Sequence, residues 1–135
     1  MYGLIHLGFR DFVQERLGNG VWDLVVNQRD LAEDSFISMS SYADNVTIGM
    51  ITSAANASGI GLEKMLEEFG RYWISYMGRG EYAPMMEFAG KDFTSFLMNI
   101  NNIHDAVKGA IDGAKTPSFD VVKVNDKSIV IRYGS

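Results

Sequence analysis

The sequence predicts an α+β fold, with an N-terminal bundle of helices followed by an antiparallel hairpin at the C-terminal end. Apolar residues recur at helical spacing over most of residues 2–111, and the pattern becomes β-rich from residue 119 onward. Of the 135 residues, 47% are hydrophobic and 21% are charged, values that are ordinary for a globular protein. We therefore expect residues 1–135 to form a single domain.

Two helices are expected before residue 30. The first covers residues 2–17 and ends at the glycines of residues 18–20. Its stripe consists of Ile5, Phe9, Phe12, Val13 and Arg16. A short second helix is indicated by Val21, Trp22, Val25 and Val26. Residues 30–43 have a mixed composition and are expected to connect this helix to the next.

The middle of the chain predicts two further helices. Asp44 or Asn45 can cap a helix that runs to about Ala57, and the glycines of residues 58–61 then break the chain. Residues 62–77 give a clear amphipathic pattern, with charged residues on the face opposite the apolar one. The apolar face consists of Leu62, Met65, Leu66, Phe69, Trp73, Tyr76 and Met77.

The last third of the chain changes from helical to β-rich patterns. A short helix is expected over residues 82–89 and a longer one over residues 92–110. Residues 119–124 and 129–133 are β-rich, and the loop 125–128 between them predicts a hairpin. A lone two-stranded hairpin is marginally stable in water. We expect it to pack on the helices, to pair with another chain, or to be extended by further sequence in the natural protein.

Charge and composition exclude several classes of function. The net charge is −5 and the basic residues are scattered, which does not favour binding to nucleic acid. Cysteine is absent, which excludes disulfides, zinc–thiolate sites, iron–sulfur clusters and cysteine nucleophiles. The sequence has neither a signal-like N-terminus nor an apolar run near the ~20 residues of a membrane span. We expect a cytoplasmic protein that does not bind membranes.

His104 is the most informative residue, because it lies on the apolar stripe of the helix 92–110. A buried imidazole needs a partner for its polar nitrogens. One nitrogen can bond a backbone carbonyl, and the other could donate its lone pair to a metal. One histidine cannot build a zinc site, but it can hold a haem, because the porphyrin supplies four nitrogens. From periodicity alone, a partly exposed histidine or a core histidine satisfied by hydrogen bonds is the more frequent case.

Five segments of the chain resemble the haem nitric-oxide/oxygen-binding (H-NOX) family. The segments are Met1–His6, Glu68–Trp73, Phe96–His104, Pro117–Phe119 and Tyr133–Ser135. They occur in family order and at family-like spacing, and they span the whole chain, so the match is more specific than any single motif. The resemblance implies an H-NOX fold that holds one haem b, that is, iron protoporphyrin IX.

The resemblance implies roles on both sides of this haem. His104 looks like the proximal ligand of the iron, and Pro117 looks like the proline that presses on the porphyrin and distorts it. Three residues match positions that line the distal side: Ile5, Phe9 and Trp73.

Tyr133 and Ser135 match the first two residues of the family's tyrosine-x-serine-x-arginine motif, which clamps the haem propionates. The chain ends two residues before the arginine of that motif and lacks the family's C-terminal segment. We therefore expect a C-terminally shortened member with an incomplete sheet. Its open sheet edge favours a homodimer.

The implied function is a gas sensor rather than an enzyme. Nitric oxide, bound opposite His104, would weaken the bond to that histidine and signal to a partner such as a histidine kinase or a cyclic-nucleotide enzyme. The apolar Ile5 and Phe9 favour nitric oxide, with oxygen and carbon monoxide as other ligands. The alternative is a haem-free interaction module that self-associates. A peroxidase-like enzyme is disfavoured because no distal acid–base pair can be placed.

Other residues have structural explanations that outweigh functional ones. His6 could be a second axial ligand, but it lies off the first stripe and is better explained as a satisfied or surface histidine. Met85 and Met86 are expected to fill gaps in the core. The glycines at residues 59–61 lack the lysine of a phosphate loop. A solvated helix face is expected for Glu63, Glu67 and Glu68.

Overall fold

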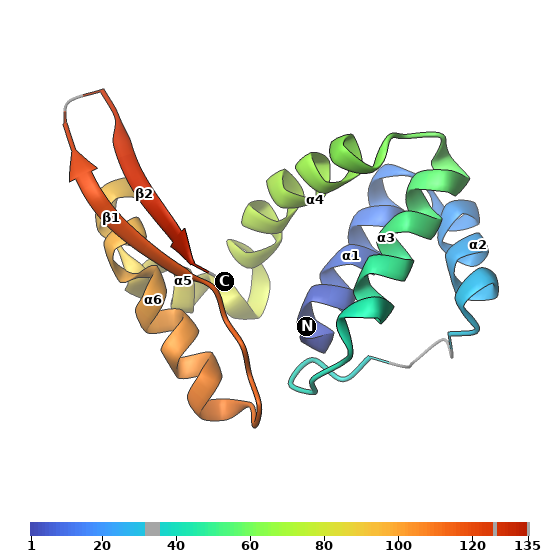
Figure 1. Cartoon of the computed structure of the whole chain (residues 1–135), viewed down its shortest axis with the longest axis horizontal. Coiled ribbons are helices and arrows are strands. Elements are labelled where there is room, and N and C mark those ends of the chain that lie inside the picture. Colours follow the sequence, from blue (N-terminus) through green and yellow to red (C-terminus); the bar gives the residue numbers. More distant parts are fainter. Residues whose placement is uncertain (32–35, 126, 135) are drawn as a thin grey trace. The chain divides into compact units, whose positions relative to one another are not determined.

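The computed structural model describes residues 1–31, 36–125 and 127–134, and it confirms the α+β architecture (Figure 1). In these residues six α-helices and one 3₁₀ turn precede a single antiparallel hairpin. The helices and strands are α1 (Gly3–Arg16), α2 (Asn19–Arg29), α3 (Asp44–Ser58), α4 (Leu62–Met77), the 3₁₀ turn η1 (Gly80–Tyr82), α5 (Ala83–Ala89), α6 (Phe93–Ala110), β1 (Ser118–Val124) and β2 (Ile129–Gly134).

The chain divides into two compact units, residues 1–76 and residues 77–135. The first unit contains α1 to α3 and nearly all of α4, and the second contains α5, α6 and the hairpin. Each unit has its own buried residues. The single domain that the chain length favours stays a prediction.

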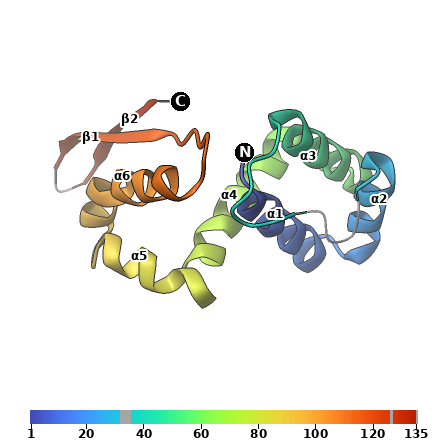
Figure 2. The same cartoon turned by 90° about the horizontal axis from the view of Figure 1, so that it is seen from below.

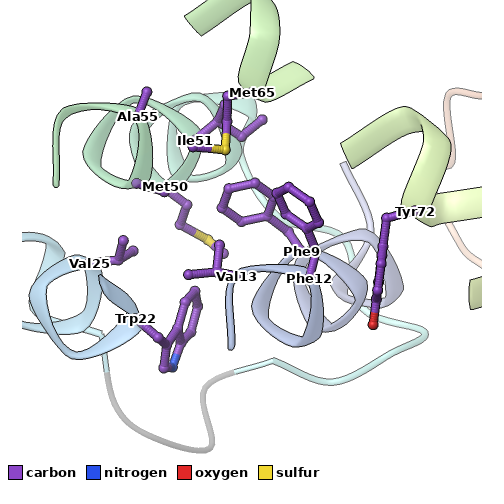
Figure 3. Packing of buried hydrophobic residues seen from close by; sticks show 11 residues of the cluster. Phe9, Phe12, Val13, Trp22, Val25, Met50, Ile51, Ala55, Met65 and Tyr72 are labelled. Atoms are coloured by element: carbon purple, nitrogen blue, oxygen red, sulfur yellow. The ribbon is translucent and has the colours of Figure 1, made fainter. Parts of the chain in front are cut away.

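The core of the first unit is built where α2 packs against both α1 and α3. Figure 3 shows the side chains that fill it. They are Phe9, Phe12, Val13, Trp22, Val25, Met50, Ile51, Ala54, Ala55, Met65 and Tyr72. Burying an aliphatic or aromatic side chain of this size stabilises the fold by about 1.5–3 kcal/mol. The stripe predicted for the first helix is thus confirmed for Phe9, Phe12 and Val13.

Two expectations for the first unit were wrong in detail. Helix α3 is preceded by Ala43 at the N-cap, and no side chain caps it. The Asp44 carboxylate instead accepts a hydrogen bond of 2.9 Å from the amino group of Met1, while it lies in the first turn, where the helix dipole favours a negative charge. On α4, the buried face includes Tyr72, because its ring packs on Phe12 at 5.5 Å.

In the second unit, η1 is followed directly by α5, which has Pro84 in its first turn and packs against α6. Helix α6 begins with a capping box. The Asp92 carboxylate accepts from the Ser95 amide at 2.9 Å, and the Ser95 hydroxyl accepts from the Asp92 amide at 3.3 Å. These bonds satisfy backbone N–H groups that the first turn leaves open, and they fix where α6 starts.

The hairpin packs on α6 through β1, which was one of the three expected outcomes (Figure 2). The strands pair antiparallel, with Phe119 opposite Tyr133 and Val121 opposite Ile131, and the register shifts once between Val121 and Lys123. Such a shift bends a strand locally. The packing on α6 gives this small sheet the support that an isolated hairpin lacks.

Candidate functional site

His104 is held in one ring orientation by the segment that precedes β1. Its Nδ1 lies 2.8 Å from the carbonyl oxygen of Pro117, in a half-buried position. A carbonyl oxygen can only accept, so Nδ1 is the nitrogen that carries the proton and donates. Nε2 is then left with its lone pair. A metal-binding histidine has this arrangement, because its second nitrogen is fixed by a carbonyl or carboxylate.

The environment of His104 also favours the neutral ring. Burial lowers the pKa of His104, and this effect outweighs the hydrogen bond to Pro117, which raises the pKa. Of the neighbouring charges, Lys108 lowers the pKa of His104 and Asp105 raises it. Because only the neutral imidazole can donate a lone pair to a metal, burial prepares this side chain for ligation.

The ring of Phe119 packs between the rings of His104 and Tyr133 and contacts both. The rings of His104 and Phe119 have centroids 5.7 Å apart, and Phe119 meets Tyr133 edge-on at 5.4 Å. The side chain of Tyr133 is largely exposed on β2. The structure therefore brings His104, Pro117 and Tyr133 together in the second unit. Ser135, the remaining candidate of this group, lies outside the described residues.

Phe119 and Asn101 lie in two of the family-like segments, but the sequence assigned neither of them a role. The Asn101 side chain hydrogen-bonds the backbone of Phe119. The sequence did place Asn101 near the site, because it precedes His104 by three residues on a helix and the two therefore share a face. Its bonding partner could not be read from the sequence.

The three distal candidates belong to the first unit. Phe9 is only 1% exposed, and its ring meets Phe69 edge-on at 5.1 Å. Trp73 is half-buried and contacts the same ring at 6.0 Å. Ile5, one turn before Phe9 on α1, is also half-buried. The structure thus links Phe9 and Trp73 through Phe69, and it places Phe9 within the hydrophobic core.

Gly8 allows Trp73 to approach α1 closely. A Cβ atom at this position would lie 2.7 Å from Cζ3 of Trp73. The Trp73 ring also stacks on Tyr76, with centroids 5.7 Å apart and an angle of 24° between the planes. The absence of a side chain at Gly8 therefore sets the position of the tryptophan.

His6 is a core histidine whose ring is only half satisfied: the surface position expected as one alternative was wrong, and among the described residues no hydrogen-bond partner meets its buried Nδ1. It is fully buried, and its Nε2 lies 2.6 Å from the hydroxyl oxygen of Thr47. The ring packs against Phe36 and Tyr42. Burial, and secondarily the positive charge of the N-terminus, lowers the pKa of His6 to about 4. The ring is therefore neutral near neutral pH.

The acidic residues of α4 form a solvated face, as expected. Lys64 pairs with Glu68 at 2.7 Å, and Arg71 pairs with Glu67 at 2.9 Å, each one turn apart. Beside this face, a groove of about 600 Å³ lies between α1 and α4, with Phe12 in its lining. None of the predicted site residues lines it.

Two features are absent from the part of the chain that the structure describes. None of its helices has the length and apolar character needed to cross a membrane. Within the same residues, no group of three or more histidine, cysteine, aspartate or glutamate side chains could hold a metal ion.

Comparison with known families decides what kind of domain this is. The model of the haem-NO-binding family (HNOB) matches residues 2–135. The chain belongs to the haem-NO-binding, or H-NOX, family. The resemblance expected from the sequence is confirmed, and the chain is a haem-binding gas-sensor domain.

The relatives are much longer proteins. Soluble guanylate cyclase 89Da of Drosophila melanogaster is 27% identical over 135 residues, which are 100% of this chain and 20% of that protein. Soluble guanylate cyclase gcy-33 of Caenorhabditis elegans is 26% identical over 135 residues, which are 100% of this chain and 14% of that protein. The H-NOX chain described here thus spans a fifth or less of these relatives.

Solved H-NOX structures share the fold. An H-NOX protein from S. oneidensis in the Fe(II) ligation state has a TM-score of 0.86 at 21% identity, and the match covers 100% of this chain and 72% of that one. The oxygen complex of an oxygen-binding H-NOX domain related to soluble guanylate cyclases has a TM-score of 0.84 at 22% identity, over 98% of this chain and 70% of that one. At these identities the likeness establishes the fold alone.

The donor set of the second unit fits a haem. A haem iron needs one protein nitrogen with a free lone pair, because the porphyrin supplies the other four donors. Nε2 of His104 has that lone pair, since Nδ1 is engaged by Pro117. Phe119 provides an apolar contact beside the ring. The site therefore needs no second metal-binding side chain.

Proposed function

We propose that this H-NOX domain binds one haem b through Nε2 of His104 and uses it to sense a diatomic gas. The hydrogen bond of 2.8 Å between Nδ1 of His104 and the Pro117 carbonyl carries the proposal, because it leaves Nε2 free for iron. When bound, the haem supplies four equatorial nitrogens and an iron that takes up the gas. Belonging to the haem-NO-binding family supports the same role.

In this proposal, residues of the second unit orient the His104 ring and hold the haem. Pro117 fixes the imidazole ring through its carbonyl, and its rigid side chain is the proposed contact that distorts the porphyrin. Tyr133 exposes 62% of its surface, so its hydroxyl can reach a propionate. We propose Ser135 as the second propionate contact, by its place in the family motif.

The distal residues are proposed to select the gas. Ile5, Phe9 and Trp73 match the family's distal positions. The side chains of Ile5 and Phe9 carry no hydrogen-bond donor, and the indole N–H of Trp73 is the one donor among the three, so a distal side this poor in donors disfavours oxygen relative to nitric oxide. We therefore propose nitric oxide as the preferred ligand.

The signal is proposed to pass to an enzyme, either a cyclic-nucleotide enzyme or a histidine kinase. The relatives are named soluble guanylate cyclases, which supports the first of these. We also propose a cytoplasmic location, where such a partner would be found.

Haem reconstitution tests the proposal. The wild-type chain is expected to give a stoichiometric Soret band, and His104→Gly is expected to lose most of it, with partial recovery when imidazole is added. Asn102→Ala, an exposed change on the same helix, should match the wild type. An unchanged Soret band in His104→Gly would rule out His104 as the ligand.

A second candidate function, self-association without haem, is supported by the apolar surface of the hairpin. Val122, Val124, Val130 and Ile131 are all exposed. Exposed apolar strands favour pairing with another chain. Sedimentation of the haem-free chain should then show a dimer, which Val130→Lys would weaken. A monomer at all concentrations would remove this candidate.

A further inference from the structure

Three asparagines precede His104 on α6, and they make different contacts. Asn99 donates to the carbonyl of Ala89 on α5 at 2.9 Å. Asn102 donates only within the helix, to the side chain of Asn99 at 3.3 Å. Asn101 instead reaches β1. Asn99 and Asn101 therefore connect α6 to other elements, whereas Asn102 makes a contact on the surface of α6 alone.

The contact of Asn101 is made by both ends of its amide. Nδ2 donates to the carbonyl of Phe119 at 2.9 Å, and Oδ1 accepts from the amide of Phe119 at 2.9 Å. Two bonds to a single residue fix its orientation as well as its position. The side chain is half-buried, so removing it would leave two backbone groups without these partners.

This contact lies beside the bond that orients His104. Asn101 and His104 are three residues apart on α6 and share a face. Their backbone partners, Phe119 and Pro117, are two residues apart in the segment that leads into β1. The same face of α6 therefore holds this segment at two points.

We propose that Asn101 is a positioning residue for His104: by clamping the backbone of Phe119, it keeps the Pro117 carbonyl on Nδ1 and so keeps the lone pair on Nε2. In water the Nε2–H form of imidazole is the more populated one, so the opposite form needs such support. The link to iron rests on the proposed function, but the effect on the imidazole proton does not.

Asparagine is the side chain that this contact requires. Aspartate can accept from the Phe119 amide but cannot donate to the Phe119 carbonyl, and its charge repels that oxygen. Alanine makes neither bond. Asn101→Asp and Asn101→Ala therefore remove one bond and both bonds, and Asn102→Ala is the matched control on the same helix.

The test uses the haem-free full chain, with ¹⁵N-labelled histidine, in an NMR experiment that reports which ring nitrogen of His104 carries the proton. In the wild type and in Asn102→Ala we expect mainly Nδ1–H. In Asn101→Ala the ratio of Nδ1–H to Nε2–H should fall several-fold, and exchange of the Phe119 amide should rise by about tenfold or more, because both side-chain bonds to Phe119 are lost.

An Nδ1–H population in Asn101→Ala equal to that in Asn102→Ala would overturn the proposal, even if the Phe119 amide exchanges faster. If Asn101→Ala does not fold, Asn101→Asp decides in the same way. A reduced Nδ1–H population in this variant supports the proposal, and an unchanged population overturns it.

A haem-loaded arm separates this inference from the proposed function. Asn101→Ala should release haem roughly 10- to 100-fold faster than Asn102→Ala, the range typical of outer contacts to a metal ligand. If the wild type takes up no haem, the proposed function fails, while the haem-free NMR result still decides the role of Asn101.

Discussion

Among single residues, His6 shows most directly how burial changes the chemistry of a side chain. Its ring is closed in by Phe36, Tyr42 and Thr47, and the N-terminal charge is near enough to oppose a proton. In the unfolded chain the ring has its ordinary pKa of 6.5, whereas in the folded chain the pKa is about 4. The folded state therefore favours the neutral ring more strongly than the unfolded state does.

Acid should destabilise the protein through this residue. Between pH 6.5 and pH 4 the unfolded state binds the proton more readily, so the free energy of unfolding falls as the pH falls. Above pH 6.5 the free energy of unfolding is not reduced by this residue. Below pH 4 the reduction is complete and amounts to about 3 kcal/mol. Urea titrations across this range should show the decline in the wild type and a shallower one in His6→Gln. Equal slopes would contradict the assignment to His6.

Gly8 offers a test of close packing at the residue scale. Gly8→Ala gains helix propensity but pushes a methyl group into the Trp73 ring, so we expect a net loss of about 1 kcal/mol in the free energy of unfolding. Gly70→Ala on α4 has open space around the new methyl group and should stabilise by up to about 1 kcal/mol. Thermal unfolding of both variants checks the pair. Stabilisation of equal size in both would show that Trp73 moves away freely.

At the scale of elements, the hairpin depends on its turn as well as on α6. The Asn125 carboxamide oxygen accepts from the amides of Lys127 and Ser128 at 3.0 and 2.9 Å. Removing that acceptor leaves the turn with its backbone bond from the Asn125 amide to the Ser128 carbonyl but without the side-chain bonds that support it.

Asn125→Ala should weaken the hairpin by about 1 kcal/mol, because the turn loses these two bonds. Amide exchange of Val124 and Ile129 should accelerate several-fold, while Lys127→Ala should leave it unchanged. Exchange in Asn125→Ala that equals the wild-type rate would mean that α6 alone holds the strands.

Helices and strands were predictable from the sequence because each is encoded by local periodicity. The capping box at Asp92 and Ser95 is also local, and α6 begins there. The contacts that position His104 are not local. Asn101 meets a residue 18 positions away, and His6 meets one 41 positions away. The sequence pattern could indicate that these polar residues lie on helices, but it could not predict which distant residues they contact.

The candidate site was predictable in part for the same reason. The helical stripe indicated His104, and family spacing indicated Pro117 and Tyr133, which the structure brings together through Phe119. The resemblance named Ile5, Phe9 and Trp73. The helical pattern placed Phe69 on an apolar face but could not show that it links Phe9 to Trp73, and no pattern indicated the close approach of Gly8 to Trp73.

For the whole molecule, haem binding should appear as stability. A ligand that binds only the folded state stabilises it by about 2.7 kcal/mol at 100 times its dissociation constant. Adding haem should therefore raise the melting temperature of the wild type, and its removal should reverse the rise. His104→Gly should show little of the effect. An equal rise in both proteins would indicate haem adsorbed elsewhere.

The bond between iron and Nε2 of His104 can be observed directly by resonance Raman spectroscopy of the ferrous, haem-loaded chain. With ¹⁵N-labelled histidine, the iron–nitrogen stretching band should move to lower frequency. In labelled His104→Gly rescued with unlabelled imidazole, the band should return to its unlabelled position. Ligation by His104 would be contradicted if the label did not shift the band in the wild type. It would also be contradicted if the band kept its labelled position after His104 is removed.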